Sequence, residues 1–508
     1  MASLRSELDR ASIPVMENDK KFFLFVLLGT TLLHVTLAVW APPSGDEAYY
    51  WDCSRHLDWS YFDQPPLVIW AMIPFRAILG ETTLAIRMPA ILASLLIALA
   101  LVPIVRRLGG GLREAGLAYL VLHGTPLVFL ASSYASTDIA MVAAYTIATA
   151  AAMAVADGEI RGWWGFGLAI GLGFLAKFPM VLALAVIGAA VIWGEGKRHL
   201  TRATPYLAAL LAFACTTPVW IWATQHNWDN ITFQLEGRHS SAGFTLKYLG
   251  EYLGANLVLF SPPLLIALAA AWWLASRRTD PAWRVAMVSA ITPFAFFALL
   301  ALRSRMSPHW GAPGVVVAMA MLVLLPFRFK RGLLVVGVIF GGLVVAAALA
   351  IIAAPQELLE FQWTYSGRPG RVSTSSAAAM IGNEEIAREV MTRLRPGEIM
   401  ASSSYTNVHL LSFLTGGVLE TRLANVNNGL HGLASLYWHR PEDLVGRDFL
   451  FVANDRRGDL HIPLSEIFGS TVEKAPIEIH RDGRLIRTIR VIRCSNLLEP
   501  GPVFTRLD

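Results

Sequence analysis

Long apolar segments alternate with short polar ones over the first two thirds of the chain. The apolar segments lie near residues 22–40, 83–104, 114–135, 138–156, 163–176, 179–194, 203–222, 248–274, 285–302, 311–327 and 332–354. A helix of about 20 apolar residues spans a hydrocarbon core roughly 30 Å thick. The pattern therefore predicts a polytopic α-helical membrane protein with about 11 transmembrane helices within residues 22–354.

One apolar stretch, residues 163–194, is interrupted by Lys177 and Pro179. Each half has about 14–16 residues, or roughly 21–24 Å of helix, which is short for a full span. Two short helices meeting at Lys177 would hold its ammonium group near the outer leaflet, and irregular backbone at that depth must be buried in protein or line a cavity. An ordinary kinked pair whose lysine extends to the interface remains the alternative.

The hydropathy falls after Ala354, so residues 355–508 are expected to form a separate soluble domain. The segments GEIMASSS, RDFLFVAN and LIRTIRVIRC alternate apolar and polar residues in the manner of strands, while NEEIAREVMTRLR has the pattern of an amphipathic helix. A mixed α/β fold follows for this domain.

The charge distribution orients the chain. It is 55% hydrophobic and 16% charged, and its formal net charge of +5 comes from Lys and Arg clusters in alternate polar gaps. The positive-inside rule makes those gaps cytoplasmic. The N-terminal segment 1–21 is then cytoplasmic, and the first loop, 41–82, and the domain 355–508 lie on the other side of the membrane. The charge does not indicate nucleic acid, and the three cysteines form neither a metal-ligand spacing nor a disulfide framework.

The first outward loop carries two helix-start signals. Ser44-Gly45-Asp46-Glu47 has the form of a capping box with Ser44 as N-cap. Asp63-Gln64-Pro65-Pro66 has proline where a first helical turn tolerates it. Two interfacial helices are expected, with aromatic residues as membrane-level anchors, namely Tyr49, Tyr50, Trp51, Trp59, Tyr61 and Phe62. Helix N-termini near the headgroups can bind anions.

Three carboxylates stand at the predicted outer ends of helices: Asp46, Asp63 and Asp138. Helix capping would explain each one, at about 1 kcal/mol per cap. Ser or Asn would cap as well, however, so a shared cleft explains three acids more economically. An acid that takes a proton from a sugar hydroxyl must lie within hydrogen-bond reach of it.

Cations on the same predicted side suit a phosphate leaving group, because positive charge stabilises the charge that develops on it. They are Arg87, Lys177, Arg238, His239, Arg303, Arg305 and His309. Binding of lipid headgroups is the alternative explanation for any single one.

These motifs resemble a known family. GDEAYYWDCSRHLDWSYFDQPPLVIWAMIPFRAILGETTLAIRMPAIL, STDIA, FLAKFPM, WATQHNWDNITFQLEGRH and RMSPHWGAP follow, in order, the motifs of bacterial glycosyltransferases of the protein O-mannosyltransferase and aminoarabinose transferase superfamily, which have the GT-C fold. The resemblance covers roughly residues 20–330. It implies an enzyme that takes its sugar from a polyprenyl-phosphate carrier and passes it to an acceptor outside the cytoplasmic membrane.

Carried over to this chain, the resemblance makes Asp46, Glu47 and Asp138 catalytic. It implies that Lys177 and Arg238 contact the lipid phosphate. The further candidate substrate-binding residues are Asp63, Gln64, Arg87, His239 and His309. Gln64 stands where the family usually has His or Lys, and it cannot neutralise phosphate. This departure weakens an aminoarabinose assignment.

The expected acceptor is lipid A or the lipopolysaccharide core, and the sugar is galacturonic acid, a hexose or aminoarabinose. A protein O-glycosyltransferase and a transporter or flippase of lipid-linked sugars are the alternatives. A transporter would place its ionisable residues at mid-membrane, whereas here they gather at one face. No metal-ligand cluster is apparent, although Asp46 and Asp138 could share a divalent cation.

Overall fold

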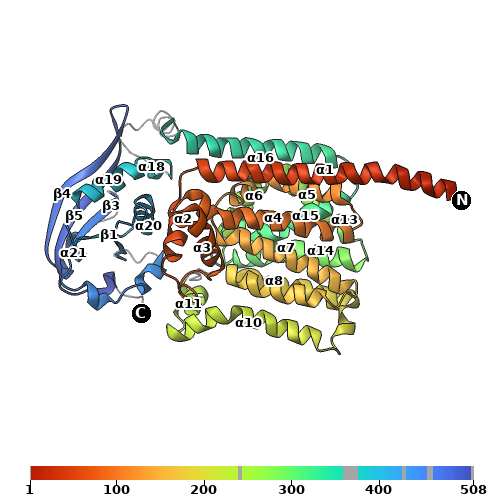
Figure 1. Ribbon diagram of the computed structural model, residues 1–508, viewed down its shortest axis with the longest axis horizontal. Coiled ribbons are helices and arrows are strands. Elements are labelled where there is room, and N and C mark those ends of the chain that lie inside the picture. Colours follow the sequence, from red (N-terminus) through yellow and green to blue (C-terminus); the bar gives the residue numbers. More distant parts are fainter. Residues whose placement is uncertain (1, 238–242, 358–375, 426–430, 455–460, 505–508) are drawn as a thin grey trace. The chain divides into compact units, whose positions relative to one another are not determined.

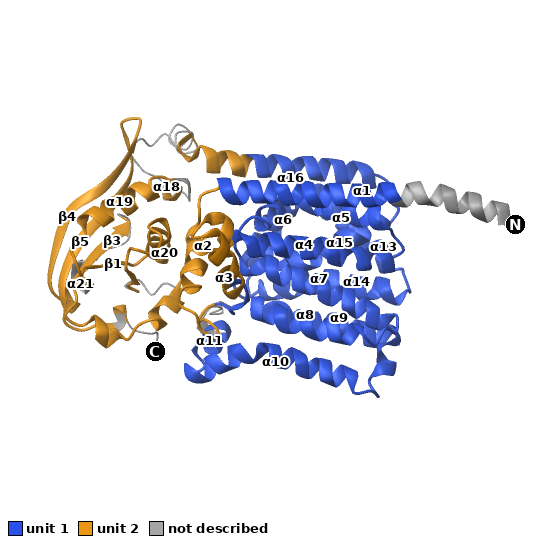
Figure 2. Cartoon of the chain, viewed as in Figure 1, with its two compact units in different colours: residues 1–40, 64–68, 87–346 blue, residues 41–63, 69–86, 347–508 orange. Residues whose placement is uncertain are grey.

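The chain divides into two compact units. The computed structural model describes residues 2–237, 243–357, 376–425, 431–454 and 461–504 (Figure 1). Unit 1 consists of residues 1–40, 64–68 and 87–346, and unit 2 of residues 41–63, 69–86 and 347–508 (Figure 2). Most of the first predicted loop therefore belongs with the C-terminal segment and not with the helices that flank it in the sequence.

Unit 1 is helical. Its helices are α1 (Ala2–Trp40), α4 (Thr83–Arg107, whose first turn belongs to unit 2), α5 (Leu112–His123), α6 (Pro126–Ala131), α7 (Thr137–Ala156), α8 (Gly162–Ala176), α9 (Ala183–Trp193), α10 (Thr204–Gln225), α11 (Asp229–Thr232), α12 (Leu246–Phe260), α13 (Pro262–Ala275), α14 (Pro281–Leu300), α15 (Ala312–Leu324) and α16 (Lys330–Ala353). Helix α15 is buried over nearly its whole length and packs against α5, α7, α13 and α14. Gly314 lets it approach α14, because a Cβ there would collide with the Ala290 carbonyl.

The described residues contain six helices that are long and apolar enough to cross a membrane. They are α4, α7, α10, α14, α16 and residues Glu17–Trp40 of α1. A bent pair, α12 with α13, would make a seventh, and four further apolar helices are shorter. The chain is therefore a polytopic helical membrane protein, while the count of about eleven spans stays a prediction.

Two apolar runs that the hydropathy presents as continuous are broken in the structure. The run 114–135 divides into α5 and α6 around Gly124 and Thr125. The run 248–274 bends by 102° between α12 and α13, at Ser261, whose φ is 62°. Pro262 follows directly, and a proline ring disfavours helical geometry in the residue before it. Apolar composition alone does not reveal such breaks.

Unit 2 contains a five-stranded sheet in the order β2-β1-β3-β5-β4. The strands are β1 (Ile399–Ser402), β2 (Thr421–Leu423), β3 (Phe449–Asn454), β4 (Phe468–Arg481) and β5 (Arg484–Leu497). Strand β1 pairs in parallel with β2 and β3, whereas β3–β5 and β4–β5 are antiparallel. The β4–β5 hairpin turns at Asp482-Gly483, both with positive φ, which is the preferred chemistry of a two-residue turn. The three segments predicted as strands are β1, β3 and β5.

Both faces of this sheet are covered. Helices α18 (Ser376–Met380), α19 (Asn383–Arg393), α20 (Tyr405–Leu414) and α21 (His461–Ile467) belong to the same unit. Leu450 and Val452 of β3 pack with apolar residues of α19 and α20, while Phe449 and Phe451 pack on the other face with α21 and Phe504. This alternation is what a strand period of two requires.

The remaining helices of unit 2 come from the first loop: α2 (Gly45–Cys53) and most of α3 (Leu67–Leu79). Helix α2 packs on α20. Helix α3 begins one residue after Pro66, so the two prolines precede the helix and do not occupy its first turn.

The expected role of the loop aromatics as membrane anchors is wrong for most of them. Tyr49, Tyr50, Trp51, Tyr61 and Phe62 are buried, and only Trp59 of this set is exposed. The physical reason is packing within unit 2. Tyr49 and Trp51 contact His409 and Phe413 of α20, and Phe62 stacks on Tyr437.

Truncation of the sheet core should destabilise unit 2 selectively. Phe451→Ala removes a fully buried ring from the central strand and should lower the free energy of unfolding by about 3–5 kcal/mol. Val472→Ala, on the half-exposed edge strand β4, is the matched control and should cost less than about 0.5 kcal/mol. Thermal unfolding of both purified variants measures the difference; equal melting temperatures would contradict the assigned core.

Candidate active site

The capping box predicted at the start of α2 is confirmed. The Ser44 hydroxyl accepts from the Glu47 backbone N–H at 3.2 Å, and the Ser44 N–H donates to Glu47 Oε2 at 3.1 Å. Glu47 is fully buried. One of its carboxylate oxygens therefore serves the helix start, which is a structural use of a residue predicted to be catalytic.

Asp46, the adjacent residue, is exposed. The Tyr405 hydroxyl, at the start of α20, donates to Asp46 Oδ1 at 2.7 Å. Burial of the phenol, and then the negative charge of Asp46, raise the pKa of Tyr405, so the hydroxyl remains a donor at neutral pH. An oriented, solvent-accessible carboxylate at a helix N-terminus is suited to accept a proton from an incoming hydroxyl.

Asp63 lies in the interior of unit 2. It is 5% exposed, and it accepts from the Tyr49 hydroxyl at 2.5 Å and from the Gly432 N–H at 3.3 Å. The Ala434 N–H donates to the same tyrosine oxygen at 3.3 Å. Burial and the charge of Asp63 raise the pKa of Tyr49 well above its usual value. These contacts give Asp63 a positioning function, since they hold the segment around residues 432–434 against α2.

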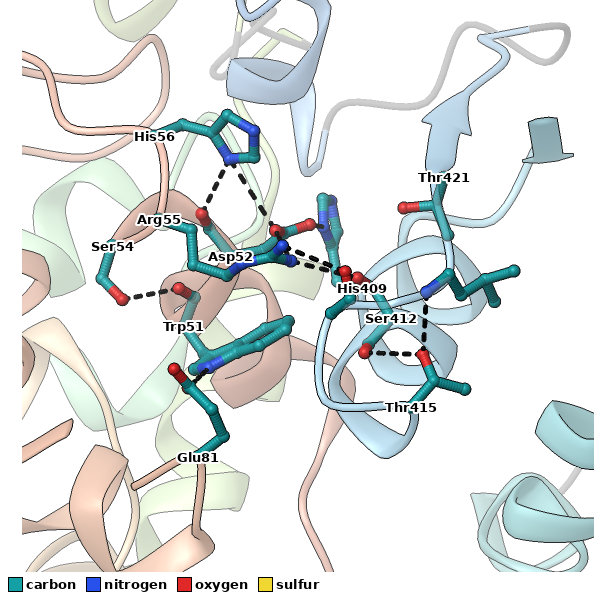
Figure 3. A network of polar contacts seen from close by, with 12 residues as sticks. Trp51, Asp52, Ser54, Arg55, His56, Glu81, His409, Ser412, Thr415 and Thr421 are labelled. Carbon is teal, nitrogen blue, oxygen red and sulfur yellow. Dashed lines mark hydrogen bonds and ion pairs between the residues drawn. The ribbon is translucent and has the colours of Figure 1, made fainter. Parts of the chain in front are cut away.

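A buried ion cluster around Asp52 of α2 was not predicted from the sequence. Asp52, 3% exposed, lies 2.9 Å from Nδ1 of the fully buried His409 on α20 (Figure 3). Arg55 donates to Asp52 at 3.2 Å and reaches the Gly417 carbonyl and Ser412 of the C-terminal segment. The only sequence signal was the i,i+3 pairing of Asp52 with Arg55, because His409 lies more than 350 residues away.

Competing effects act on the Asp52 carboxyl. Burial raises its pKa, but the hydrogen bond with His409 and the electrostatic interactions with His409, His56 and Arg55 outweigh burial, so the pKa is lowered. The carboxylate is thus ionised at neutral pH in a buried position, and its partners hold α2 on α20.

In unit 1 the structure brings together three of the predicted residues. Lys177 Nζ lies 2.6 Å from Asp138 Oδ1, and His309 Nε2 lies 3.7 Å from Asp138 Oδ2. Asp138 is in the first turn of α7, and His309 is in the short 3-10 helix Pro308–Gly311 before α15. The Lys177 ammonium also lies 5.6 Å from the ring centre of Trp310.

The backbone explains how Lys177 reaches this cluster. Helix α8 ends at Ala176, Lys177 is extended with φ −161° and ψ 137°, and a 3-10 helix begins at Phe178. The predicted break between two short helices is therefore confirmed. The lysine side chain is only 12% exposed. A poorly solvated ammonium with one carboxylate beside it can bind a phosphate as a point charge.

The remaining residues predicted to bind substrate are Arg87, Gln64, Arg238 and His239. Arg87 is buried and donates to the Ala38 carbonyl at 3.0 Å, which ties α4 to the end of α1. Gln64 is half-buried. Arg238 and His239 lie outside the described residues. Asp46 belongs to unit 2 and Asp138 to unit 1, so the convergence of these two carboxylates stays a prediction.

Over the described parts of the chain, no three His, Cys, Asp or Glu side chains are grouped so that they could hold a metal ion. A divalent cation shared by Asp46 and Asp138 also stays a prediction.

Comparison with a solved structure identifies the fold. A crystal structure of ArnT from Cupriavidus metallidurans bound to undecaprenyl phosphate superimposes with a TM-score of 0.63 at 16% identity, covering 96% of this chain and 99% of that one. The chain therefore has the fold of that structure.

A family match covers part of the sequence. Residues 63–222 match the family described as dolichyl-phosphate-mannose-protein mannosyltransferase, and this segment carries a domain of that family. The chain is 25% identical over 319 residues to the lipid A galacturonosyltransferase RgtD of Rhizobium johnstonii, covering 61% of this chain and 67% of that protein. It is 31% identical over 215 residues to the undecaprenyl phosphate-alpha-4-amino-4-deoxy-L-arabinose arabinosyl transferase of Edwardsiella ictaluri, covering 38% of this chain and 37% of the relative. The predicted resemblance and the predicted enzyme class, a glycosyltransferase, are confirmed.

The lowered pKa of Asp52 makes the stability of unit 2 depend on pH. The ionised carboxylate stabilises the fold above the ordinary Asp pKa of about 4, and this contribution is lost as the pH falls through the lower folded value. Asp52→Asn should therefore reduce the free energy of unfolding at neutral pH by roughly 1.5–3 kcal/mol. Thermal unfolding, with the exposed Asp443→Asn as control, should show the deficit shrinking below about pH 4. A deficit that is independent of pH would argue against an ionised Asp52.

Proposed function

We propose that this chain transfers a single sugar from a polyprenyl-phosphate carrier to lipid A or the lipopolysaccharide core, on the periplasmic side of the bacterial inner membrane. The observation that carries the proposal is the similarity to a lipid A galacturonosyltransferase over 61% of the chain. The similarity to an arabinosyl transferase with an undecaprenyl-phosphate-linked donor supports the same class of carrier.

The proposed orientation of the chain in the membrane follows from the positive-inside rule. With Lys20, Lys21 and the later basic clusters in the cytoplasm, the first loop and the C-terminal segment lie outside. The packing of α2 on α20 supports this, because segments of one compact unit must lie on the same side of the membrane. The count of about eleven spans requires some of the shorter apolar helices to cross the bilayer.

Asp46 acts on the acceptor in this proposal. It takes the proton of the acceptor hydroxyl while the hydroxyl oxygen forms a bond to C1 of the donor sugar. The bond between C1 and the phosphate oxygen breaks at the same time, and its electron pair leaves with the polyprenyl phosphate. This one-step displacement inverts the configuration at C1. Tyr405 positions Asp46 through the 2.7 Å hydrogen bond that it donates.

Lys177 acts on the donor. Its ammonium stabilises the negative charge that develops on the leaving phosphate, since a fixed cation in a poorly solvated site needs no reorganisation during the reaction. Asp138 holds that ammonium in place until the phosphate arrives, and His309 lies beside the same carboxylate.

Galacturonic acid is the sugar that the similarities favour. The first relative is named for that sugar. Gln64 carries no charge at a position where aminoarabinose transferases usually have lysine, which separates this chain from the second relative.

Removal of the Asp46 charge should abolish transfer. A deletion strain complemented with wild-type protein should regain one sugar residue on lipid A or core oligosaccharide, measured by mass spectrometry, and Asp46→Asn should not restore it. Purified Asp46→Asn should be slower by about 10²–10⁴-fold, the usual contribution of a general base. Asp58→Asn, an acid of the same loop, is the matched control and should behave as wild type.

Normal transfer by Asp46→Asn would remove the catalytic assignment. A deletion that changes the mass of envelope proteins but leaves lipid A and core unchanged would favour protein O-glycosylation instead.

The Lys177–Asp138 pair allows a test of the donor site. Lys177→Gln should lower kcat/KM by about 10²–10³-fold, because the leaving phosphate loses its cation. Lys247→Gln, an exposed lysine of unit 1, should have no effect. The double variant Asp138→Asn with Lys177→Gln should remain inactive; recovery of activity would mean that Lys177 only neutralises Asp138.

A further inference from the structure

Arginine and tryptophan side chains pair at the ends of three neighbouring helices of unit 1. Helix α14 packs against both α9 and α13 (Figure 2). Three contacts place a guanidinium carbon over an indole ring: Arg277 with Trp273 at 3.7 Å, Arg278 with Trp283 at 5.2 Å, and Arg284 with Trp193 at 5.7 Å. Trp273 is in the last turn of α13, Trp193 ends α9, and Arg284 is in the first turn of α14. The contacts therefore form one surface where these three helices end.

This surface carries a surplus of positive charge. The segment after α9, residues 194–202, and the connection from α13 into α14, residues 276–284, together contain six Lys or Arg residues but two carboxylates, Glu195 and Asp280. Glu195 is already paired with Arg198. Within the described residues, the guanidinium groups of the three tryptophan-bound arginines have no carboxylate partner. Their charge is therefore available to an anion.

The indole rings orient these arginines. A cation over an indole face is attracted by the ring, and that attraction uses none of the N–H donors of a guanidinium group. The donors form a planar fork that can give two parallel hydrogen bonds to the oxygens of one phosphate. A ring that fixes the fork therefore prepares it for a phosphate, which a freely moving surface arginine does not offer.

The surface lies at the level of lipid headgroups. Helix α14 is long and apolar enough to cross a membrane, and α13 belongs to the bent pair that would make a further span. Trp273 and Trp193 are 57% and 40% exposed. Tryptophan at the end of an apolar helix is typical of the membrane–water interface. The positive-inside rule predicts that this interface is the cytoplasmic one, where basic sites between helices bind anionic headgroups.

We propose that this surface binds one anionic phospholipid with two phosphate groups, of the cardiolipin class. Arg277 and Arg278 bind one phosphate, and Arg284 binds the other. Trp273 and Trp193 pack against the glycerol and acyl parts of the lipid. Two phosphates fit better than one because the arginines are distributed from the end of α13 to the end of α9, and packed helix axes are about 8–10 Å apart. The proposal does not depend on sugar transfer.

Native mass spectrometry of the delipidated full-length protein tests the site. The probes are cardiolipin, phosphatidylglycerol, which has one phosphate, and phosphatidylethanolamine, which has no net charge. Cardiolipin should bind at least about tenfold more tightly than either of the others, a difference of about 1.4 kcal/mol. Equal binding of phosphatidylglycerol or of phosphatidylethanolamine would overturn the proposal.

Variants locate the binding. The triple change Arg277→Gln, Arg278→Gln and Arg284→Gln should weaken cardiolipin binding by about tenfold or more. Arg331→Gln, an exposed arginine in the first turn of α16 on the same predicted side, is the matched control and should bind as wild type. An equal loss in the control, or no loss in the triple variant, would show that cardiolipin does not bind at this surface.

A charge-conserving variant separates an oriented site from diffuse attraction. Replacing Arg277, Arg278 and Arg284 by Lys keeps the charge but removes the planar fork, so the preference for cardiolipin should largely disappear. Trp273→Leu keeps all three arginines, alters an exposed ring and should weaken binding by about two- to fivefold, the usual strength of an exposed cation–π contact. Wild-type binding by the lysine variant would overturn the proposal.

The carrier-phosphate site proposed around Lys177 is a second place where an anionic lipid could bind. Lys177→Gln should therefore bind cardiolipin as wild type, and a loss in this variant would assign the signal to the donor site and refute the proposal. Asp46→Asn should also bind cardiolipin normally although it no longer transfers sugar. Failure of sugar transfer and failure of phospholipid binding are thus separate outcomes.

Discussion

A buried carboxylate sets the arrangement of unit 2. Asp52 is removed from water, and an ionised carboxylate in that position is tolerated only when cations and hydrogen bonds compensate its lost hydration. His409 and Arg55 provide that compensation, and they require α2 to lie on α20. Tyr405 is four residues before His409 on the same helix, so the contact that satisfies Asp52 also places a hydroxyl beside Asp46. The interactions that compensate the buried Asp52 therefore also orient the exposed Asp46.

The neighbouring contacts extend this arrangement. Asp63, through Tyr49 and Gly432, holds the segment that leads to Trp438 and His439. That segment and β2 line a cavity of unit 2. Three acids of one loop therefore differ in their surroundings: Asp46 is exposed, while Asp52 and Asp63 are buried and position their neighbours. Residue type alone did not distinguish them, because burial and partners decide which carboxylate remains accessible.

Unit 1 uses the same electrostatics within an apolar environment. Lys177 is kept close to Asp138 by the extended backbone between two short helices, so a positive charge is maintained where water is scarce. That break was predictable from Pro179 and from helix lengths too short to span. The sequence predicted only that Lys177, Asp138 and His309 lie on the same side of the membrane. The spacing of these residues along the chain does not define the distances between their side chains.

The sequence alone indicated a polytopic helical glycosyltransferase with candidate chemistry at Asp46, Asp138 and Lys177. The signals were the apolar pattern, the basic clusters and the separated motifs. They could do so because helix period, hydrophobic length and charge bias are local properties. The tertiary structure decided which residues meet. It removed the loop aromatics from the lipid surface, joined the first loop to a helix more than 350 residues later, and exposed Asp46 while burying Asp52 and Asp63. Those outcomes depend on long-range packing and on the cost of burying charge, neither of which is encoded in any one segment.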